Sequence, residues 1–348
     1  MSADTAVWRR RDVRVFGGLV LATTLAGCTT ATTAPAASST TGPAGATTIT
    51  ATELLQVTSP HELTGMTLLE GPTFGPDGDL YVVDVTAPPG GPKVLRIDTE
   101  SLDVTPVHTD STSAYTSAQF SPVDDRLYLT DFIGGRIDSV TADGGDLRQF
   151  FAGDVDGAPI HPDDVSFDEA GHLYVTDSAG YDRPYWEASG RLIRLDGSTA
   201  EPSVLADGLA APNGVAFTPG FDGLWVTHNT GNQVDFVRLD ETRSRVAVAF
   251  PALYIDGGTT QVDSAAVDAD GNLYLGLHGR AAVLVYSDTG EHLATVEMPH
   301  DEDGVGSATN LAIEPGTTDA YVTVSGEAGG YVYRFTALGE GIRQSNGG

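Results

Sequence analysis

The sequence has a single cysteine, Cys28, among its 348 residues. A disulfide within the chain is therefore excluded, so packing and hydrogen bonding must stabilise the fold. Basic residues are scarce as well, because 18 Lys and Arg stand against 48 Asp and Glu, for a formal net charge of −30. Nucleic-acid phosphates require cationic side chains, so this balance argues against a nucleic-acid partner. It favours solubility and the attraction of cations.

The apolar stretch near the N-terminus, Val15 to Leu25, is too short to span a bilayer. Arginines precede it, and Leu25-Ala26-Gly27-Cys28 follows it. This arrangement resembles a lipobox, where a signal peptidase cuts before the cysteine and the thiol carries diacylglycerol. We expect a lipoprotein signal peptide at residues 1–27 and an extracytoplasmic protein anchored to the cell membrane through Cys28. An ordinary secretory signal with an incidental cysteine is the alternative.

The next segment lacks large apolar residues, because residues 29–48 are all Thr, Ala, Ser, Gly or Pro. Such a composition buries little surface and is typical of a flexible tether, which we assign to residues 28–50. Beyond it, no persuasive helical period is present. We therefore expect an all-β domain at residues 51–340 and a disordered tail at 341–348.

A repeat of about fifty residues organises this domain. Each copy has an apolar strand, a turn with Asp or Gly, and a second strand of the form Leu-Tyr-Val. The aromatic residue of that second strand recurs at Tyr81, Tyr128, Tyr174, Trp225, Tyr274 and Tyr321. The third copy shows four strand-like runs, starting with Val165 to Phe167 and ending with Pro202 to Leu205.

Four strands per repeat at this period predict a β-propeller blade, and six repeats predict six blades. A parallel β-solenoid is the alternative, but its rungs are shorter than these units. The last repeat lacks an outer strand, and Leu54 to Val57 is placed to supply it and close the ring.

The first strands of a propeller line its central channel, so equivalent positions face one another. Four residues before each first-strand anchor, the sequence has only oxygen-bearing side chains: Glu70, Thr116, Asp163, Asn213, Asp263 and Thr309. Carboxylates that converge in a poorly solvated channel repel each other unless a cation lies among them. Oxygen ligands without Cys or His suit a hard cation, and Ca²⁺ fits best because it accepts six to eight oxygens in loose geometry. Solvated polar positions without a metal are the alternative. A one-residue shift of register would place Asn310 in the ring instead of Thr309.

From these residues onward the chain resembles the senescence marker protein, gluconolactonase and luciferin-regenerating enzyme family, and most of all its drug-responsive lactonase subgroup in staphylococci. The likeness runs from about Ala51 to the C-terminus. Its specific pieces include Leu69-Glu70-Gly71, Asp163-Asp164-Val165, Pro212-Asn213-Gly214 and Val262-Asp263-Ser264. The resemblance implies a six-bladed propeller with a divalent ion in its channel.

The resemblance also implies roles for particular residues. Glu70, Asp163, Asn213 and Asp263 would bind the catalytic calcium, with Ser264 contributing as in the subgroup. Asp163 departs from the Asn usual in gluconolactonases, which weakens a sugar-lactone assignment. A second, structural calcium known in the subgroup is in doubt here. The corresponding stretch contains Asp154 and Asp156 but differs in length and composition; two solvated loop acids are the alternative.

These observations predict a calcium-dependent hydrolase that opens a lactone or similar ester, with Asp263 as acid/base. Asp163 would share that role or act as nucleophile. A calcium-dependent phosphotriesterase on the same scaffold and a non-catalytic binding propeller are the rival functions. The oligomeric state is left open. No Ser lies in a Gly-x-Ser-x-Gly elbow, so a serine esterase is not supported.

Residues near the predicted ring have weaker assignments. We expect Asp84, Asp131 and Asp177 to cap bends after the second strands. His161 is placed to line the channel mouth, but a structural role is favoured for it and for His228 and His278. Tyr181, Tyr185 and Trp186 either wall an apolar substrate pocket or pack a loop.

Overall fold

The structure is a computed structural model that describes residues 45–181, 187–300 and 304–343. The predicted signal peptide, Cys28 and most of the predicted tether lie outside the described residues. Within them the fold is all-β, and no α-helix is present. No helix long and apolar enough to cross a membrane occurs in the same residues.

Four of the sheets have four antiparallel strands each, in the order of the sequence. The first contains β3 (Leu69–Phe74), β4 (Leu80–Asp84), β5 (Pro92–Ile97) and β6 (Val104–Thr109). The second contains β7 (Tyr115–Phe120), β8 (Leu127–Asp131), β9 (Arg136–Val140) and β10 (Arg148–Ala152). The third contains β11 (Pro162–Phe167), β12 (Leu173–Asp177), β13 (Gly190–Leu195) and β14 (Pro202–Leu209). The fourth contains β15 (Pro212–Phe217), β16 (Gly223–His228), β17 (Gln233–Leu239) and β18 (Val246–Tyr254).

The remaining nine strands form one sheet that combines the last two sequence repeats. One repeat contributes β19 (Gln261–Val267), β20 (Leu273–His278), β21 (Ala282–Tyr286) and β22 (His292–Glu297). The other contributes β23 (Val305–Ile313), β24 (Asp319–Gly326) and β25 (Gly329–Thr336). A single residue pair, Leu277 with Ala308, links β20 to β23.

Two N-terminal strands complete this sheet. β2 (Thr52–Thr58) pairs antiparallel with β25, so Leu54 to Val57 does supply the outer strand that the last repeat lacks. β1 (Thr47–Thr50) pairs parallel with β22. Ordered structure therefore begins before Ala51, where the domain was expected to start. The reason is that β1 covers the outer edge of β22 and places Ala51 in the core.

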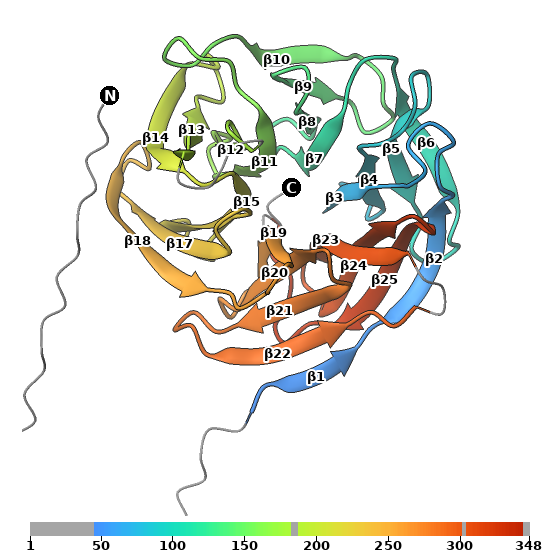
Figure 1. Ribbon diagram of the computed structural model, residues 1–348. Helices are drawn as coiled ribbons and strands as arrows, with labels where there is room; N and C mark the ends of the chain where they lie inside the picture. Colours follow the sequence, from blue (N-terminus) through green and yellow to red (C-terminus); the bar gives the residue numbers. More distant parts are fainter. Residues whose placement is uncertain (1–44, 182–186, 301–303, 344–348) are drawn as a thin grey trace, which may run out of the picture. The chain divides into compact units, whose positions relative to one another are not determined.

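The sheets lie around a common axis, with β3, β7, β11, β15, β19 and β23 innermost (Figure 1). Consecutive inner strands contact one another, and β23 contacts β3. The arrangement is propeller-like, and it brings the starts of the inner strands together although they are far apart in sequence.

The repeated aromatic residues explain how neighbouring sheets pack. The Tyr of one second strand meets the Phe of the next first strand edge-on, as in Tyr81 with Phe120 at 5.0 Å between ring centroids. Equivalent pairs are Tyr128 with Phe167 at 5.1 Å, Tyr174 with Phe217 at 4.8 Å, and Tyr321 with Phe74 at 5.5 Å. Each such pair adds roughly 0.5–1.5 kcal/mol beyond the area it buries. The aromatic pattern that revealed the repeat is thus the contact that joins the repeats.

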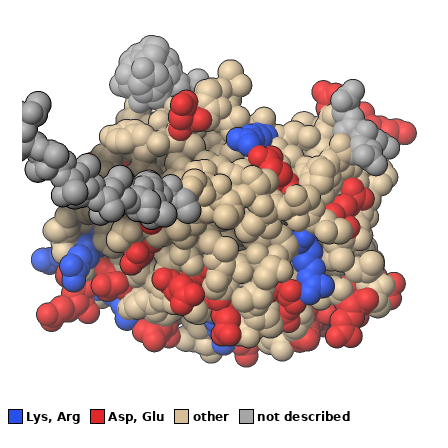
Figure 2. Space-filling view, turned by 90° about the horizontal axis from the view of Figure 1, so that it is seen from below, with Lys and Arg blue, Asp and Glu red and all other residues tan. Residues whose placement is uncertain are grey.

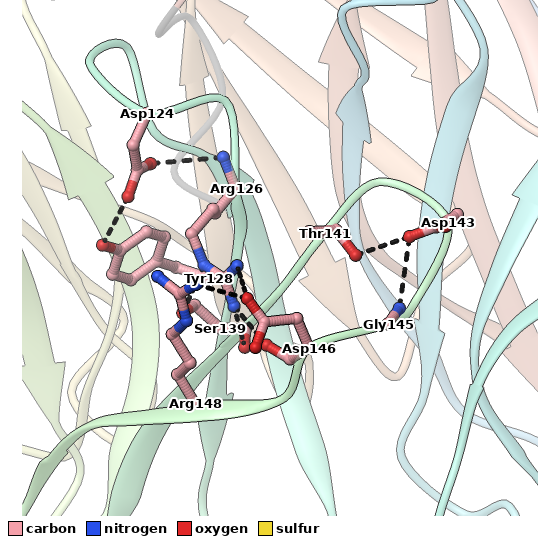
Figure 3. Close-up of polar contacts among 9 residues, drawn as sticks. All are labelled: Asp124, Arg126, Tyr128, Ser139, Thr141, Asp143, Gly145, Asp146 and Arg148. Atoms are coloured by element: carbon pink, nitrogen blue, oxygen red, sulfur yellow. Dashed lines mark hydrogen bonds and ion pairs between the residues drawn. The ribbon is translucent and has the colours of Figure 1, made fainter.

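Acidic turn residues fix the bends between successive strands of a sheet. In the second sheet, Tyr128 Oη donates to Asp124 Oδ2 at 3.2 Å, and Arg126 pairs with Asp146 at 3.1 Å (Figure 3). Arg126 Nε also donates to Ser139 Oγ at 3.0 Å. Acidic side chains outnumber basic ones on the face shown in Figure 2, as the composition requires.

The C-terminal segment crosses the end of the axis where these turns lie. Ala269 N donates to Glu340 O at 2.8 Å, and Gly341 N donates to Thr317 O at 2.8 Å. Arg343 then reaches the second sheet, where it bonds to Ser121 O at 3.1 Å and to Asp125 Oδ1 at 3.0 Å. Residues 341–343, expected to be disordered, are therefore held by backbone and charged contacts, and residues 344–348 lie outside the described residues.

Candidate active site

The largest concentration of polar inner-strand residues lines a cavity of about 330 Å³ at the opposite end of the axis. The inner strands begin at this end and the second strands finish there. Its polar lining includes Glu70, Thr116, Asp163, Asn213 and Asp263, and also Ser178, Asn229, Gln261 and His278. Its apolar lining is Leu68, Val85, Phe132, Tyr181 and Ala211. No Lys or Arg is among the described residues that line it.

A β-bulge in each inner strand aims two successive residues toward the axis. The ladder of β11 with β12 shifts between Pro162 and Val165, and that of β15 with β16 shifts between Pro212 and Val215. Similar shifts occur in β3, β7, β19 and β23. A bulge releases residues from the ladder and re-aims their side chains. The next residue of each strand therefore forms a second ring below the first: Gly71, Ser117, Asp164, Gly214, Ser264 and Asn310.

Threonine hydroxyls at the same place in successive second strands hold these bulges. Thr176 Oγ1 accepts from Asp164 N at 3.0 Å and donates to Asn213 O on the next inner strand. Thr227 Oγ1 accepts from Gly214 N at 2.7 Å and donates to Asp263 O at 2.5 Å. The hydroxyls thus satisfy backbone groups that the bulges leave unpaired, and they fix the backbone of Asn213 and Asp263.

Side chains from three sheets meet directly at Asp163. Its Oδ2 accepts from Ser178 Oγ at 2.9 Å and from Asn213 Nδ2 at 3.1 Å. Asn213 Oδ1 lies 3.4 Å from Ser264 Oγ. Asp263 Oδ2 lies 3.8 Å from Nδ1 of His278, at the cavity wall.

The carboxylates perturb one another because they are buried together. Burial raises the pKa of Asp163 to about 6, although hydrogen bonds from Ser178, Thr116 and Asn213 oppose the change. Burial raises the pKa of Glu70 well above its usual range, and the charges of Asp263, Asp164 and Asp163 add to it. Burial and the charge of Asp163 likewise raise the pKa values of Asp263 and Asp164. These carboxylates therefore share one poorly solvated region, and none of the described residues in its wall is Lys or Arg.

Such a donor set fits a hard cation in its chemistry, because carboxylate, amide and hydroxyl oxygens are the ligands that such ions prefer. Across residues 45–181, 187–300 and 304–343, no three His, Cys, Asp or Glu side chains form a metal centre by themselves. The carboxylates on their own thus do not close around an ion, and the Asn213 amide and the Ser264 hydroxyl would have to complete the ligand set.

The structure brings four of the predicted ligands, Glu70, Asp163, Asn213 and Asp263, to one cavity. Ser264 is buried beside Asn213. Thr309 is absent from the cavity lining; its hydroxyl donates to Leu69 O at 2.8 Å, contacts Thr323 at 3.2 Å and hydrogen-bonds with Glu70. It joins β23 to β3 instead. Asn310 is likewise buried and absent from the cavity lining.

The caps expected of Asp84 and Asp131 are confirmed, whereas the backbone group that Asp177 accepts from lies before β11. Asp131 Oδ1 accepts from Ala114 N at 3.1 Å and from Gly134 N at 3.0 Å. Asp177 accepts from His161 N at 2.7 Å, and Asp84 Oδ1 accepts from Thr86 N at 3.2 Å.

The histidines and aromatic residues near the site divide into two groups. His228 is buried and pairs with Asp235 at 3.0 Å, and His161 packs between Phe132 and Tyr181. Both are therefore structural. His278 and Tyr181, in contrast, line the cavity. Tyr185 and Trp186 lie outside the described residues.

The sequence reasoning missed Asp164, Ser178 and the threonine hydroxyls. The Thr that follows Leu-Tyr-Val in successive repeats was a visible signal, and Asp164 stands next to a predicted ligand. The bulge that turns both Asp163 and Asp164 inward leaves no mark of its own in the sequence. Asp154 and Asp156 are exposed around a short bridge from Val155 to Ala158, so the second calcium stays a prediction.

Comparison with known families decides the family of the chain. Residues 68–326 match the SMP-30/Gluconolactonase/LRE-like region. The chain belongs to this family. The resemblance drawn from the ring residues is therefore confirmed.

Individual relatives include lactonases of staphylococci. Lactonase drp35 of Staphylococcus saprophyticus is 27% identical over 282 residues, covering 78% of this chain and 84% of the relative. Lactonase drp35 of Staphylococcus aureus is 27% identical over 280 residues, covering 78% and 83%.

Solved structures support the fold. A gluconolactonase from Xanthomonas campestris has a TM-score of 0.65 at 20% identity, covering 85% of this chain and 99% of that one. The calcium-binding protein regucalcin from Agrobacterium tumefaciens has a TM-score of 0.67 at 18% identity, covering 86% and 99%.

Proposed function

We propose that the protein is a calcium-dependent lactonase that works at the cavity on the axis of a six-bladed propeller closed by β2. The observation that carries the proposal is the joining of Glu70, Asp163, Asn213 and Asp263, from four sequence repeats, in one cavity whose described lining has no Lys or Arg. The names of the staphylococcal relatives add support for a lactone as substrate.

A bound calcium ion would supply a Lewis acid that polarises the lactone carbonyl and stabilises the developing oxyanion. The chain would hold it through the carboxylates of Glu70, Asp163 and Asp263, the Asn213 amide and the Ser264 hydroxyl. The apolar residues of the cavity would exclude water from the rest of the substrate.

Asp263 is the better acid/base of the two candidate carboxylates. Asp163 Oδ2 is held by Ser178 and Asn213, so the carboxylate is fixed in place, and these hydrogen bonds oppose the rise in its pKa. Asp263 faces the cavity with the His278 ring at 3.8 Å. In the proposed reaction Asp263 takes a proton from the attacking water and returns it to the leaving alkoxide. The products are the ring-opened hydroxy acid and the free enzyme.

The test is hydrolysis of a panel of small lactones by protein stripped of metal, with calcium, with chelator, and with calcium restored. We expect activity that disappears with chelator and returns with calcium. An organophosphate triester assayed in parallel separates the rival phosphotriesterase, because preferred turnover of the triester would reassign the substrate. Lactone turnover that ignores the chelator would refute the calcium-dependent proposal, and no turnover of either substrate would favour a binding propeller.

We also propose that the protein works outside the cytoplasm, anchored by a lipid on Cys28. The N-terminal sequence supports this. Cells fed labelled palmitate should incorporate it into the wild-type chain and not into Cys28→Ser, and label in both would refute the anchor.

A further inference from the structure

Asp164 is a carboxylate that the proposed chemistry does not use. It follows Asp163 in β11, belongs to the second ring, and is only 1% exposed. Its Oδ2 has no hydrogen-bond partner among the described residues. A buried carboxylate oxygen without a donor is costly, so its position calls for a donor that can turn toward it.

The candidate donors are the hydroxyls of Ser264 and Ser117, which belong to the same ring, and Ser264 lowers the pKa of Asp164 more than Ser117 does. β15 lies between β11 and β19 and contributes Gly214 at this level, where a side chain is absent. A Cβ on Gly214 would come within 2.9 Å of Ser264 Cα, so the glycine lets β15 and β19 approach closely at this level. Burial and the charge of Asp163 raise the pKa of Asp164, and hydrogen bonding by Ser264 opposes them.

Ser264 has one hydrogen and two possible acceptors. Its Oγ lies 3.4 Å from Asn213 Oδ1, which is long for an O–H···O hydrogen bond. If Asn213 Oδ1 and Ser264 Oγ both present lone pairs to a cation, the hydroxyl hydrogen cannot remain between them. Asp164 Oδ2 is the acceptor that is free to receive it.

We propose that Asp164 is a positioning residue that accepts the Ser264 hydroxyl hydrogen and so turns the Oγ lone pairs toward the cation. This inference rests on the proposed calcium site. It gives a role to a carboxylate that sits one layer below the ligands and acts through one of them, as partners of metal ligands do elsewhere.

A double-mutant cycle on calcium affinity tests the inference. Isothermal titration of metal-stripped full-length chain with Ca²⁺ would compare wild type, Asp164→Ala, Ser264→Ala and the double variant. We expect each single change to weaken binding on the order of 10- to 100-fold. We expect the double variant to bind Ca²⁺ with the same affinity as the single variant that binds it less tightly, because the two substitutions remove the same interaction.

Additive losses would overturn the proposal, because they would mean that Asp164 acts through its charge and not through Ser264. Asp164→Asn sharpens the distinction, since it keeps an acceptor oxygen and removes the charge. In the wild-type background, Asp164→Asn should reduce calcium affinity less than Asp164→Ala does. Added to Ser264→Ala, it should reduce calcium affinity no further. A further loss from Asp164→Asn in that background would also overturn the proposal.

Ser166→Ala is the matched control, because Ser166 is buried on the same strand with an unpartnered hydroxyl. It should leave calcium affinity unchanged. Circular dichroism would verify that each variant is folded, and Asp164→Asn carries the test if Asp164→Ala is not. Wild type that binds no calcium would sink the proposed function itself, whereas tight wild-type binding with unchanged Asp164 variants would sink only this inference.

Discussion

The buried carboxylates predict an unusual dependence of stability on pH when calcium is removed. Burial raises the pKa of Asp163 from its usual 3.8 to about 6. The folded chain therefore binds more protons than the unfolded chain between about pH 4 and pH 6. The free energy of unfolding must then fall as pH rises through this window, because deprotonation favours the unfolded chain.

The magnitude follows from the size of the shift. About two pKa units at 1.36 kcal/mol each give roughly 3 kcal/mol. Asp163 is partly open to the cavity, so this figure is an upper limit. The raised pKa values of Glu70 and Asp263 add to the fall in the same direction. Calcium bound at the proposed site would reverse the dependence, because its ligands must be deprotonated and binding stabilises the folded chain.

The assay is urea denaturation of metal-stripped protein at several pH values from 4.5 to 7.5, for wild type and Asp163→Asn. The neutral variant avoids the cost of ionising this residue. As pH rises, the free energy of unfolding of Asp163→Asn should increase relative to that of wild type by up to about 3 kcal/mol. The same variant should bind calcium more weakly. Asp207→Asn, an exposed residue in the same sheet, is the control and should track wild type. Equal pH dependence in wild type and Asp163→Asn would refute the reasoning.

Three further predictions concern turnover and packing. Asp263→Asn should lower lactone turnover by about 10²- to 10⁴-fold with the fold intact by circular dichroism, and unchanged turnover would remove Asp263 from the mechanism. Thr176→Val should lower the free energy of unfolding, measured by urea denaturation, by about 2–4 kcal/mol, because Asp164 N and Asn213 O both lose their hydrogen-bond partner. Thr105→Val, at an exposed position, is the control and should change the free energy of unfolding little. Equal losses in the two variants would contradict the role of the Thr176 hydroxyl. Gly214→Ala should lower the free energy of unfolding by about 1–3 kcal/mol, because the new Cβ would lie 2.7 Å from Ala265 N on the neighbouring inner strand. Gly306→Ala, with open space around it, should lower it by less than about 1 kcal/mol. Similar melting temperatures for the two variants would argue against the close approach at Gly214.

The sequence predicted the part of the fold that depends on local periodicity. The Leu-Tyr-Val repeat marked the second strands because the same aromatic residue makes the same contact in successive units, as Tyr81 and Tyr174 do. The pairing of β2 with β25 was also predictable, because a missing strand leaves an open edge. β1 was not predictable, since Thr47–Thr50 has the composition of the tether before it and gains its strand only from β22.

For the candidate site, register in the repeat was enough to bring Glu70, Asp163, Asn213 and Asp263 to one cavity. Thr309, in the same register, contacts Glu70 but is absent from the cavity lining, and its hydroxyl donates to a backbone carbonyl of another sheet. Register in the repeat missed Asp164, because the ladder shift after Pro162 turns two successive side chains to the same side. Bulges and cross-sheet hydrogen bonds depend on residues distant in sequence, and no local pattern records them.

The two ends of the domain are fastened to each other, which has a consequence for its biogenesis. β2 pairs with β25, and Leu69 N donates to Ser325 Oγ at 2.8 Å. A polypeptide still missing its last sixty residues would leave β2, β3 and the site residue Glu70 without these neighbours. Unlike a linear array of repeats, which can mature one unit after another, this chain acquires its stability only after synthesis is complete. If the chain is exported unfolded, as the proposed lipid anchor would allow, its apolar strands must be shielded until β25 arrives.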